Sequence, residues 1–165
     1  MGLIGKIGKV GKFGKVGSVS VLVATTIAVI GLGAGTASAD ARQVADGTDP
    51  IRTGCANDAF TAREARGALG GVDRVLVELR YSPRCKTAWA RVTTLGIPDC
   101  VPGSDFCGQA IVHRDSDGRE QHCAIPARAH GCYTAQLNDN RVTSYAFGWA
   151  DVGAHTAYAQ TGSYR

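Results

Sequence analysis

The sequence has no acidic residue before Asp40 and only one lysine, Lys86, after residue 15. It also has no C-x-x-C pair and no G-x-S-x-G motif, two signatures of thiol redox or zinc sites and of serine hydrolases. Four of the 18 basic residues and none of the 14 acidic residues precede Asp40, so the remainder carries no net charge. This balance removes the electrostatic basis for nucleic-acid binding, and we expect no nucleic-acid partner.

The first 39 residues form a segment of their own. Regularly spaced lysines precede an uncharged stretch over residues 19–33, and small residues follow and end in Ala37-Ser38-Ala39. This order is typical of a secretory signal peptide, and we predict cleavage after Ala39 and a secreted mature protein. The rival interpretation is a membrane anchor, but the stretch is shorter than the ~20 residues of a spanning helix, so no stable anchor is expected.

All six cysteines follow the predicted signal peptide. An even number of cysteines in an exported chain predicts three disulfides, although fifteen pairings are open. One alternative is a metal site at His122, Cys123, His130 and Cys132, whose spacing matches no standard zinc pattern, so no metal and no cofactor are predicted. The other is a catalytic cysteine, which would leave an odd cysteine without a partner. The predicted disulfide cysteines are Cys55, Cys85, Cys100, Cys107, Cys123 and Cys132.

The rest of the chain divides into a polar arm and one domain. Residues 40–50 are polar with Gly and Pro and predict a flexible arm, and residues 51–165 are the length of a single domain. Residues 52–68 are predicted to contain a short helix, capped by Asn57 or Asp58 and ended by Gly70-Gly71.

Short strands account for most of the domain. Apolar alternation predicts strands over residues 75–81 and 87–94, a hairpin over 110–114 and 119–124 around an Asp/Gly turn, and a last strand over 154–161. A second hairpin is predicted over 132–137 and 141–149 around Asn138-Asp139-Asn140. The pattern indicates an all-β domain, or a β-rich one with one short helix, folded as a small disulfide-stabilised sandwich or barrel.

Three aromatic residues alternate with small ones near the C-terminus. In a strand, Tyr145, Phe147 and Trp149 share one face. They form either a stacking platform for a glycan or cell-wall polymer, or a core-facing row. We favour the core, because aromatic side chains bury large areas.

Several stretches resemble the YjfA-like family of secreted and cell-surface domains of unknown function. The similarity covers most of residues 49–165 and rests on Gly54-Cys55, on Glu78-Leu79-Arg80-Tyr81-Ser82 with Cys85, on Trp89-Ala90-Arg91, on residues 142–146 and on residues 161–164. It brings no catalytic residues. The resemblance implies that Cys55 pairs with Cys85 and that the other four cysteines pair among themselves.

The residues indicate an extracellular protein but name no ligand. Our first hypothesis is a non-catalytic binding or interaction domain associated with the cell envelope, with a cell-wall polymer or a secreted protein as partner. The second is an inhibitor of an extracellular hydrolase that presents the loop over residues 100–107. A small secreted hydrolase ranks third, because the four histidines (His113, His122, His130 and His155) form no recognisable acid–base motif and no catalytic residue is assigned.

Overall fold

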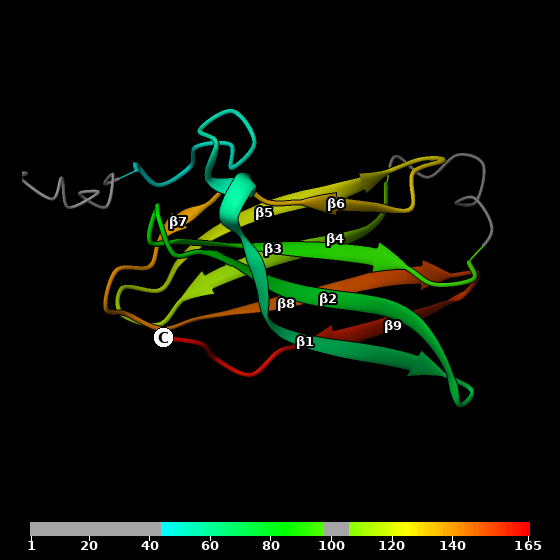
Figure 1. Cartoon of the computed structure of the whole chain (residues 1–165). Helices are drawn as coiled ribbons and strands as arrows, with labels where there is room; N and C mark the ends of the chain where they lie inside the picture. The colour runs from blue at the N-terminus through cyan, green and yellow to red at the C-terminus, as the bar shows by residue number, and fades with distance from the viewer. Residues whose placement is uncertain (1–43, 98–105) are drawn as a thin grey trace, which may run out of the picture. The chain divides into compact units, whose positions relative to one another are not determined.

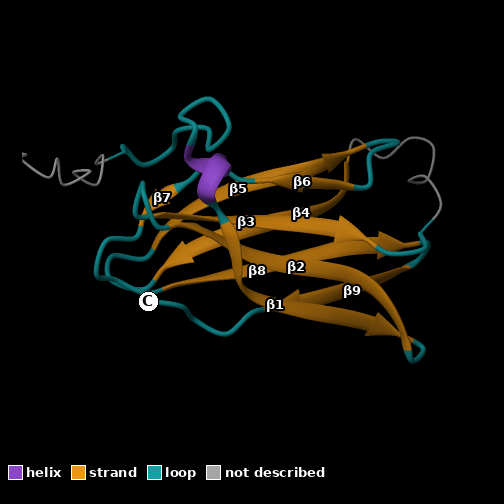
Figure 2. Cartoon of the chain, in the orientation of Figure 1, coloured by secondary structure: helices purple, strands orange, loops and turns teal. Residues whose placement is uncertain are grey.

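The computed structural model describes residues 44–97 and 106–165, which belong to one compact unit. A 3-10 turn over Cys55–Asp58 precedes nine strands, and no α-helix occurs in these residues (Figure 2). The predicted strands over 75–81, 87–94 and 154–161 and the hairpin around residues 115–118 are confirmed. The strands are β1 (Phe60–Leu69), β2 (Val72–Ser82), β3 (Thr87–Thr94), β4 (Phe106–Arg114), β5 (Arg119–Pro126), β6 (Gly131–Tyr133), β7 (Leu137–Asn138), β8 (Ser144–Val152) and β9 (His155–Gln160).

The strands form two antiparallel sheets that pack face to face (Figure 1). One sheet has the order β1-β2-β3-β6, with β7 also pairing to β3, and the other has the order β5-β4-β8-β9. The predicted all-β sandwich is therefore confirmed. The chain changes sheet between β3 and β4, between β5 and β6, and between β7 and β8.

The two sheets contribute side chains of different size to the core. The first supplies larger ones, including Val75, Val77, Leu79 and Val92, all fully buried. The second supplies mainly alanines, with Val112 and Ile125 as its larger members. A Cβ atom placed on Gly148 of β8 would lie 2.9 Å from Val77 Cγ2. The inward face of β8 therefore has room for small residues only.

Each lateral edge of the sandwich is closed by a different device. The Cys123–Cys132 disulfide joins β5 of one sheet to β6 of the other. At the opposite edge β1 meets β9, where a Cβ atom on Gly67 would lie 2.3 Å from the carbonyl oxygen of Tyr158. Only glycine permits this approach of the two backbones.

The predicted helix over residues 52–68 is wrong, because most of that segment is β1. After an irregularity between Thr61 and Arg63, the strand alternates exposed and more buried residues, which is the period of a strand. Gly70 and Gly71, predicted to end a helix, both have positive φ and connect β1 to β2. Pairing with β2 along its length outweighs the helical propensity of this alanine-containing run.

The predicted hairpin around Asn138-Asp139-Asn140 is also wrong. β6 and β7 pair with β3, whereas β8 pairs with β4 and β9 in the other sheet. The turn residues therefore carry the chain between sheets. A local turn pattern cannot distinguish these two outcomes, since both need a reversal of the chain at the same place.

Candidate ligand-binding face

The three alternating aromatics of β8 point away from the core. Tyr145, Phe147 and Trp149 are each partly buried, whereas the residues between them, Ala146 and Gly148, are buried. The expectation that the aromatics form core is therefore wrong. The physical reason is the space between the sheets, which the valines and leucine of the first sheet already fill.

Strand β9 adds a fourth aromatic that the sequence analysis did not single out. Tyr158 lies opposite Trp149 in the ladder between β8 and β9 and is 69% exposed. The alternation of residues 155–160 could have revealed its outward position, since Ala157 and Ala159 on either side of it face the core. We call Tyr145, Phe147, Trp149 and Tyr158 together the aromatic face.

A shallow hollow lies over the β8–β9 part of this face. Its volume is about 290 Å³, and it is lined by Phe147, Trp149, Asp151, Thr156 and Tyr158. The Thr156 hydroxyl donates a hydrogen bond to Asp151 Oδ1 at 3.0 Å. The hollow thus combines three aromatic rings with the Asp151 carboxylate and the Thr156 hydroxyl, a mixture typical of sites that orient a ligand through a few polar groups.

Two histidines meet a glutamate at the β4–β5 side of the same outer surface. Glu120 contacts His113 Nδ1 at 2.9 Å and His122 Nε2 at 3.2 Å, and the His113 ring stacks on Tyr145 with 4.8 Å between centroids. The hydrogen bond with His113, followed by the charges of both imidazoles, holds the pKa of Glu120 below its usual value. The sequence analysis did not bring these residues together, although the register of the predicted hairpin places His113 opposite Glu120.

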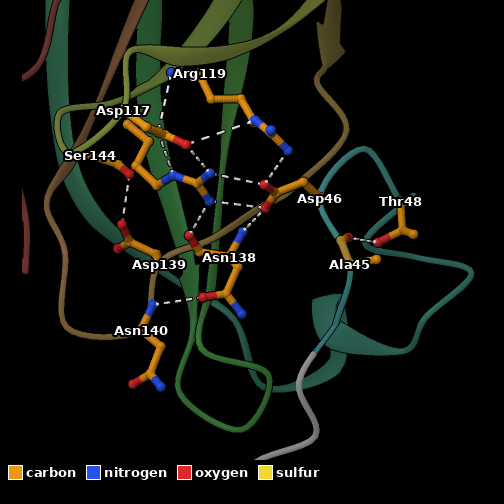
Figure 3. Close-up of polar contacts among 10 residues, drawn as sticks. Ala45, Asp46, Thr48, Asp117, Arg119, Asn138, Asp139, Asn140 and Ser144 are labelled. Carbon is orange, nitrogen blue, oxygen red and sulfur yellow. Dashed lines mark hydrogen bonds and ion pairs between the residues drawn. The ribbon is translucent and has the colours of Figure 1, made fainter.

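A second group of polar side chains lies where β4, β5 and β7 meet at one end of the sandwich (Figure 3). Arg114 donates to both oxygens of Asp46, to both oxygens of Asp117 and to the Asn138 carbonyl. Arg119 donates to Asp46 at 2.9 Å. We call Asp46, Arg114, Asp117, Arg119 and Asp139 the polar end.

The charges of the polar end stabilise one another. Burial opposes ionisation of Asp46, but hydrogen bonds from Arg114 and the Asn138 N–H, with the charges of Arg114 and Arg119, outweigh it, so its pKa lies below the usual value. The hydrogen bond from Arg114 likewise lowers the pKa of Asp117. The polar end therefore fixes the chain before β1 to the second sheet.

The residues just before β1 make further contacts with the domain. Within residues 44–50, Val44 is buried beside the Cys55–Cys85 disulfide, and Thr48 forms an antiparallel bridge with Gln136. Residues 44–50 are thus held against the domain instead of forming the expected flexible arm. The polar Gly/Pro composition concealed this, because the contacts that hold the segment come from residues distant in sequence.

Asp139 is the one carboxylate of the polar end without an arginine bound to it. Ser144 Oγ donates to its Oδ1 at 2.6 Å, and among the described residues its buried Oδ2 has no hydrogen-bond partner. Burial raises the pKa of Asp139 to about 6, and the hydrogen bond from Ser144 and the charge of Arg114 offset only part of this.

The cysteines form disulfides where the structure describes them. Cys55 is bonded to Cys85, as the resemblance implied, and Cys123 is bonded to Cys132, which leaves no thiolate for the zinc alternative. Cys107 is also disulfide-bonded, and Cys100 lies outside the described residues. Across residues 44–97 and 106–165, no three His, Cys, Asp or Glu side chains are grouped as a metal site would require.

Three sequence predictions concern segments that the structure does not describe. The signal peptide and its cleavage after Ala39 lie outside the described residues, as does most of the loop proposed for an inhibitor. In the part of the chain that is described, no helix has the length and hydropathy needed to span a membrane.

Comparison with known proteins identifies the family. Residues 43–147 match the family described as "Protein of unknown function (DUF2690)". The chain is 31% identical over 129 residues to the uncharacterized protein YjfA of Bacillus subtilis (strain 168), a match that covers 72% of this chain and 79% of that protein. No solved structure matches. The chain therefore belongs to the DUF2690 family, a family of unknown function.

Proposed function

We propose that this protein is a non-catalytic extracellular binding domain that holds a cell-envelope polysaccharide on its aromatic face. The observation that carries the proposal is the orientation of β8 and β9, which turn their small residues into the core and their aromatics outward. An exposed group of aromatic side chains on a folded domain is a common mark of an interaction site. The disulfides support an extracellular setting.

The chemistry of the face favours a saccharide over an apolar ligand. The apolar C–H side of a sugar ring packs on an aromatic ring, while its hydroxyls need donors and acceptors at the ring edges. The ladder places such groups beside the aromatics: Gln109 lies opposite Trp149, and Gln160 lies opposite Phe147. The face is an open sheet surface, which suits an extended chain that lies across it.

The hydrolase alternative has less support. Glu120 joins His113 and His122 on the outer surface, but its carboxylate is engaged by both histidines, and among the described residues no serine, threonine or cysteine side chain hydrogen-bonds to either histidine. The inhibitor alternative depends on a loop that lies mainly outside the described residues. We therefore retain the binding domain.

Co-sedimentation with purified cell-wall polysaccharide tests this function. The full-length chain is expressed in a secreting host and purified from the medium, and Tyr158→Ala is compared with wild type. Loss of one stacking contact should weaken binding about 5- to 150-fold, by analogy with ~1–3 kcal/mol per stacked base.

Tyr133→Ala is the matched control, because Tyr133 is also exposed but lies on β6 of the other sheet. It should bind like wild type. A folded Tyr158→Ala protein that binds as wild type does, or a wild-type protein that sediments with no polysaccharide, contradicts the proposal.

A further inference from the structure

The hollow on the aromatic face carries a negative charge that no residue of the described ranges neutralises. Among the described residues that line it, Asp151 is the one with a formal charge. Asp151 accepts a hydrogen bond from the neutral hydroxyl of Thr156, and no arginine, lysine or histidine of the described residues forms an ion pair with it. By contrast, Asp46 binds two arginines, and Glu78 on the other sheet also binds two.

On the described strands of this sheet, the outward positions around the hollow also carry no arginine or lysine that would compensate this charge. Outward positions on β4, β5, β8 and β9 carry Glu120 and Asp151 but no arginine or lysine. The formally basic side chains there are His113 and His122, and both contact Glu120. The described outer surface of this sheet is thus complementary to a cation and unfavourable for a polyanion.

Three aromatic rings beside a carboxylate suit an organic ammonium group. A cation is attracted to the face of an aromatic ring, and an adjacent carboxylate adds a charge-assisted hydrogen bond to an N–H donor. Phe147 and Trp149 share the outward face of β8 with Asp151, and Tyr158 lies opposite Trp149 on β9. A neutral saccharide would use the rings but gain nothing from the charge.

We propose that the hollow selects a polysaccharide with free, protonated amino groups, and that Asp151 pairs with one of them. This inference rests on the proposed function, since it specifies which saccharide the aromatic face holds. The sugar ring stacks on the aromatics while its ammonium group lies toward the Asp151 carboxylate. The second carboxylate oxygen, Oδ2, remains available as an acceptor beside Thr156.

Matched oligosaccharides separate this inference from the function beneath it. The probes are soluble glucosamine oligomers and their N-acetylated counterparts of equal length, measured by calorimetry at a mildly acidic pH that protonates the amines. Wild type should bind the amino form more tightly, by about threefold to tenfold, from one exposed ion pair with a cation–π contribution. Added salt should reduce this difference.

Asp151→Asn should lose the part of this preference that comes from the ion pair and keep wild-type affinity for the acetylated form, because Asn keeps the acceptor for Thr156 but loses the charge. Asp73→Asn is the control, since Asp73 is also a surface aspartate on a strand but lies on the other sheet; it should keep the preference. If wild type binds the two oligomers equally, the preference for amino groups is wrong, but polysaccharide binding by the aromatic face is still supported. Binding of neither oligomer, or binding of tetramethylammonium or a lysine peptide as tight as that of the amino oligomer, overturns the proposal.

Discussion

The polar end and the aromatic face differ in how far their side chains are already paired within the chain. At the polar end, Arg114 makes five hydrogen bonds within the chain, and Asp46 is bound by two arginines and a backbone N–H. On the aromatic face, Tyr158 is 69% exposed and Asp151 has one neutral partner.

This difference separates structure from function better than residue type does. A dense cluster of charges draws attention in a sequence, yet a charge whose partners all lie in the same chain has little left to offer a ligand. The aromatic face has fewer charges but more capacity for a partner. Its rings lie outward at some cost in exposed apolar surface, which a bound ligand would remove.

Arg114 provides the largest expected effect and tests whether the polar end is structural. Arg114→Met removes the guanidinium group that binds Asp46 and Asp117. The Arg114 side chain is only 11% exposed, so water cannot readily replace it. Loss of one member of such a network should lower the free energy of unfolding by about 3–5 kcal/mol, measured by urea denaturation. Binding by the protein that remains folded should be unchanged.

Arg119→Ala is the control for that substitution. Arg119 binds the same Asp46 carboxylate, but its side chain is 55% exposed. The variant should lose no more than about 1 kcal/mol. If Arg114→Met is as stable as wild type, the polar end does not hold the N-terminal segment, and its charges become candidates for a ligand site.

Asp139 gives an intermediate effect that depends on pH. Burial raises its pKa to about 6 from the model-peptide value of 3.8, so between these values the folded state holds a proton that the unfolded state releases. Its contribution to stability is therefore fully present below pH 4 and is lost as the pH rises through 6. Asn at this position stays neutral. The free energy of unfolding of Asp139→Asn, relative to that of wild type, should therefore rise by about 1–3 kcal/mol between pH 4 and pH 7.

Urea unfolding of both proteins across this pH range checks the prediction. Taking the difference between them removes the opposite contribution of Asp46 and Glu78, whose lowered pKa values favour folding at higher pH. A difference that does not change with pH would mean that folding does not raise the pKa of Asp139. The ionised form would then be stabilised by more than the hydrogen bond from Ser144 and the charge of Arg114, enough to offset both burial and the charge of the nearby Asp115.

Local pattern was enough to predict most strands but not their assignment to sheets. Residues 75–81 alternate clearly, and a short turn joins them to the apolar run over 87–94, so both strands and their pairing follow from the sequence. The sheet change between β7 and β8 does not, because a turn pattern carries no information on the next pairing partner. Strand β1 was missed because its Ala, Arg and Glu residues favour a helix until β2 is present to pair with them.

The orientation of the aromatic face was also beyond the sequence alone. Alternation placed Tyr145, Phe147 and Trp149 on one side of a strand, but which side faces the core depends on the volume that the opposite sheet leaves free. Val77 and Val92 occupy the space that a side chain at Gly148 would need. Aromatic burial is the usual outcome, and here the packing of the other sheet prevents it.

Tyr158 gives the smallest expected effect on stability and completes the comparison with Arg114. Because its ring is mostly exposed, Tyr158→Ala loses little beyond the cross-strand contact with Trp149, and the free energy of unfolding should fall by no more than about 1 kcal/mol. Thermal and urea unfolding measure this directly, with Leu79→Ala as the inward comparison at about 2–5 kcal/mol. A Tyr158→Ala protein destabilised as much as Leu79→Ala would mean that the aromatic face supports the fold. Loss of binding in that variant would then be no evidence for a ligand site, and Asp151→Asn would become the decisive substitution.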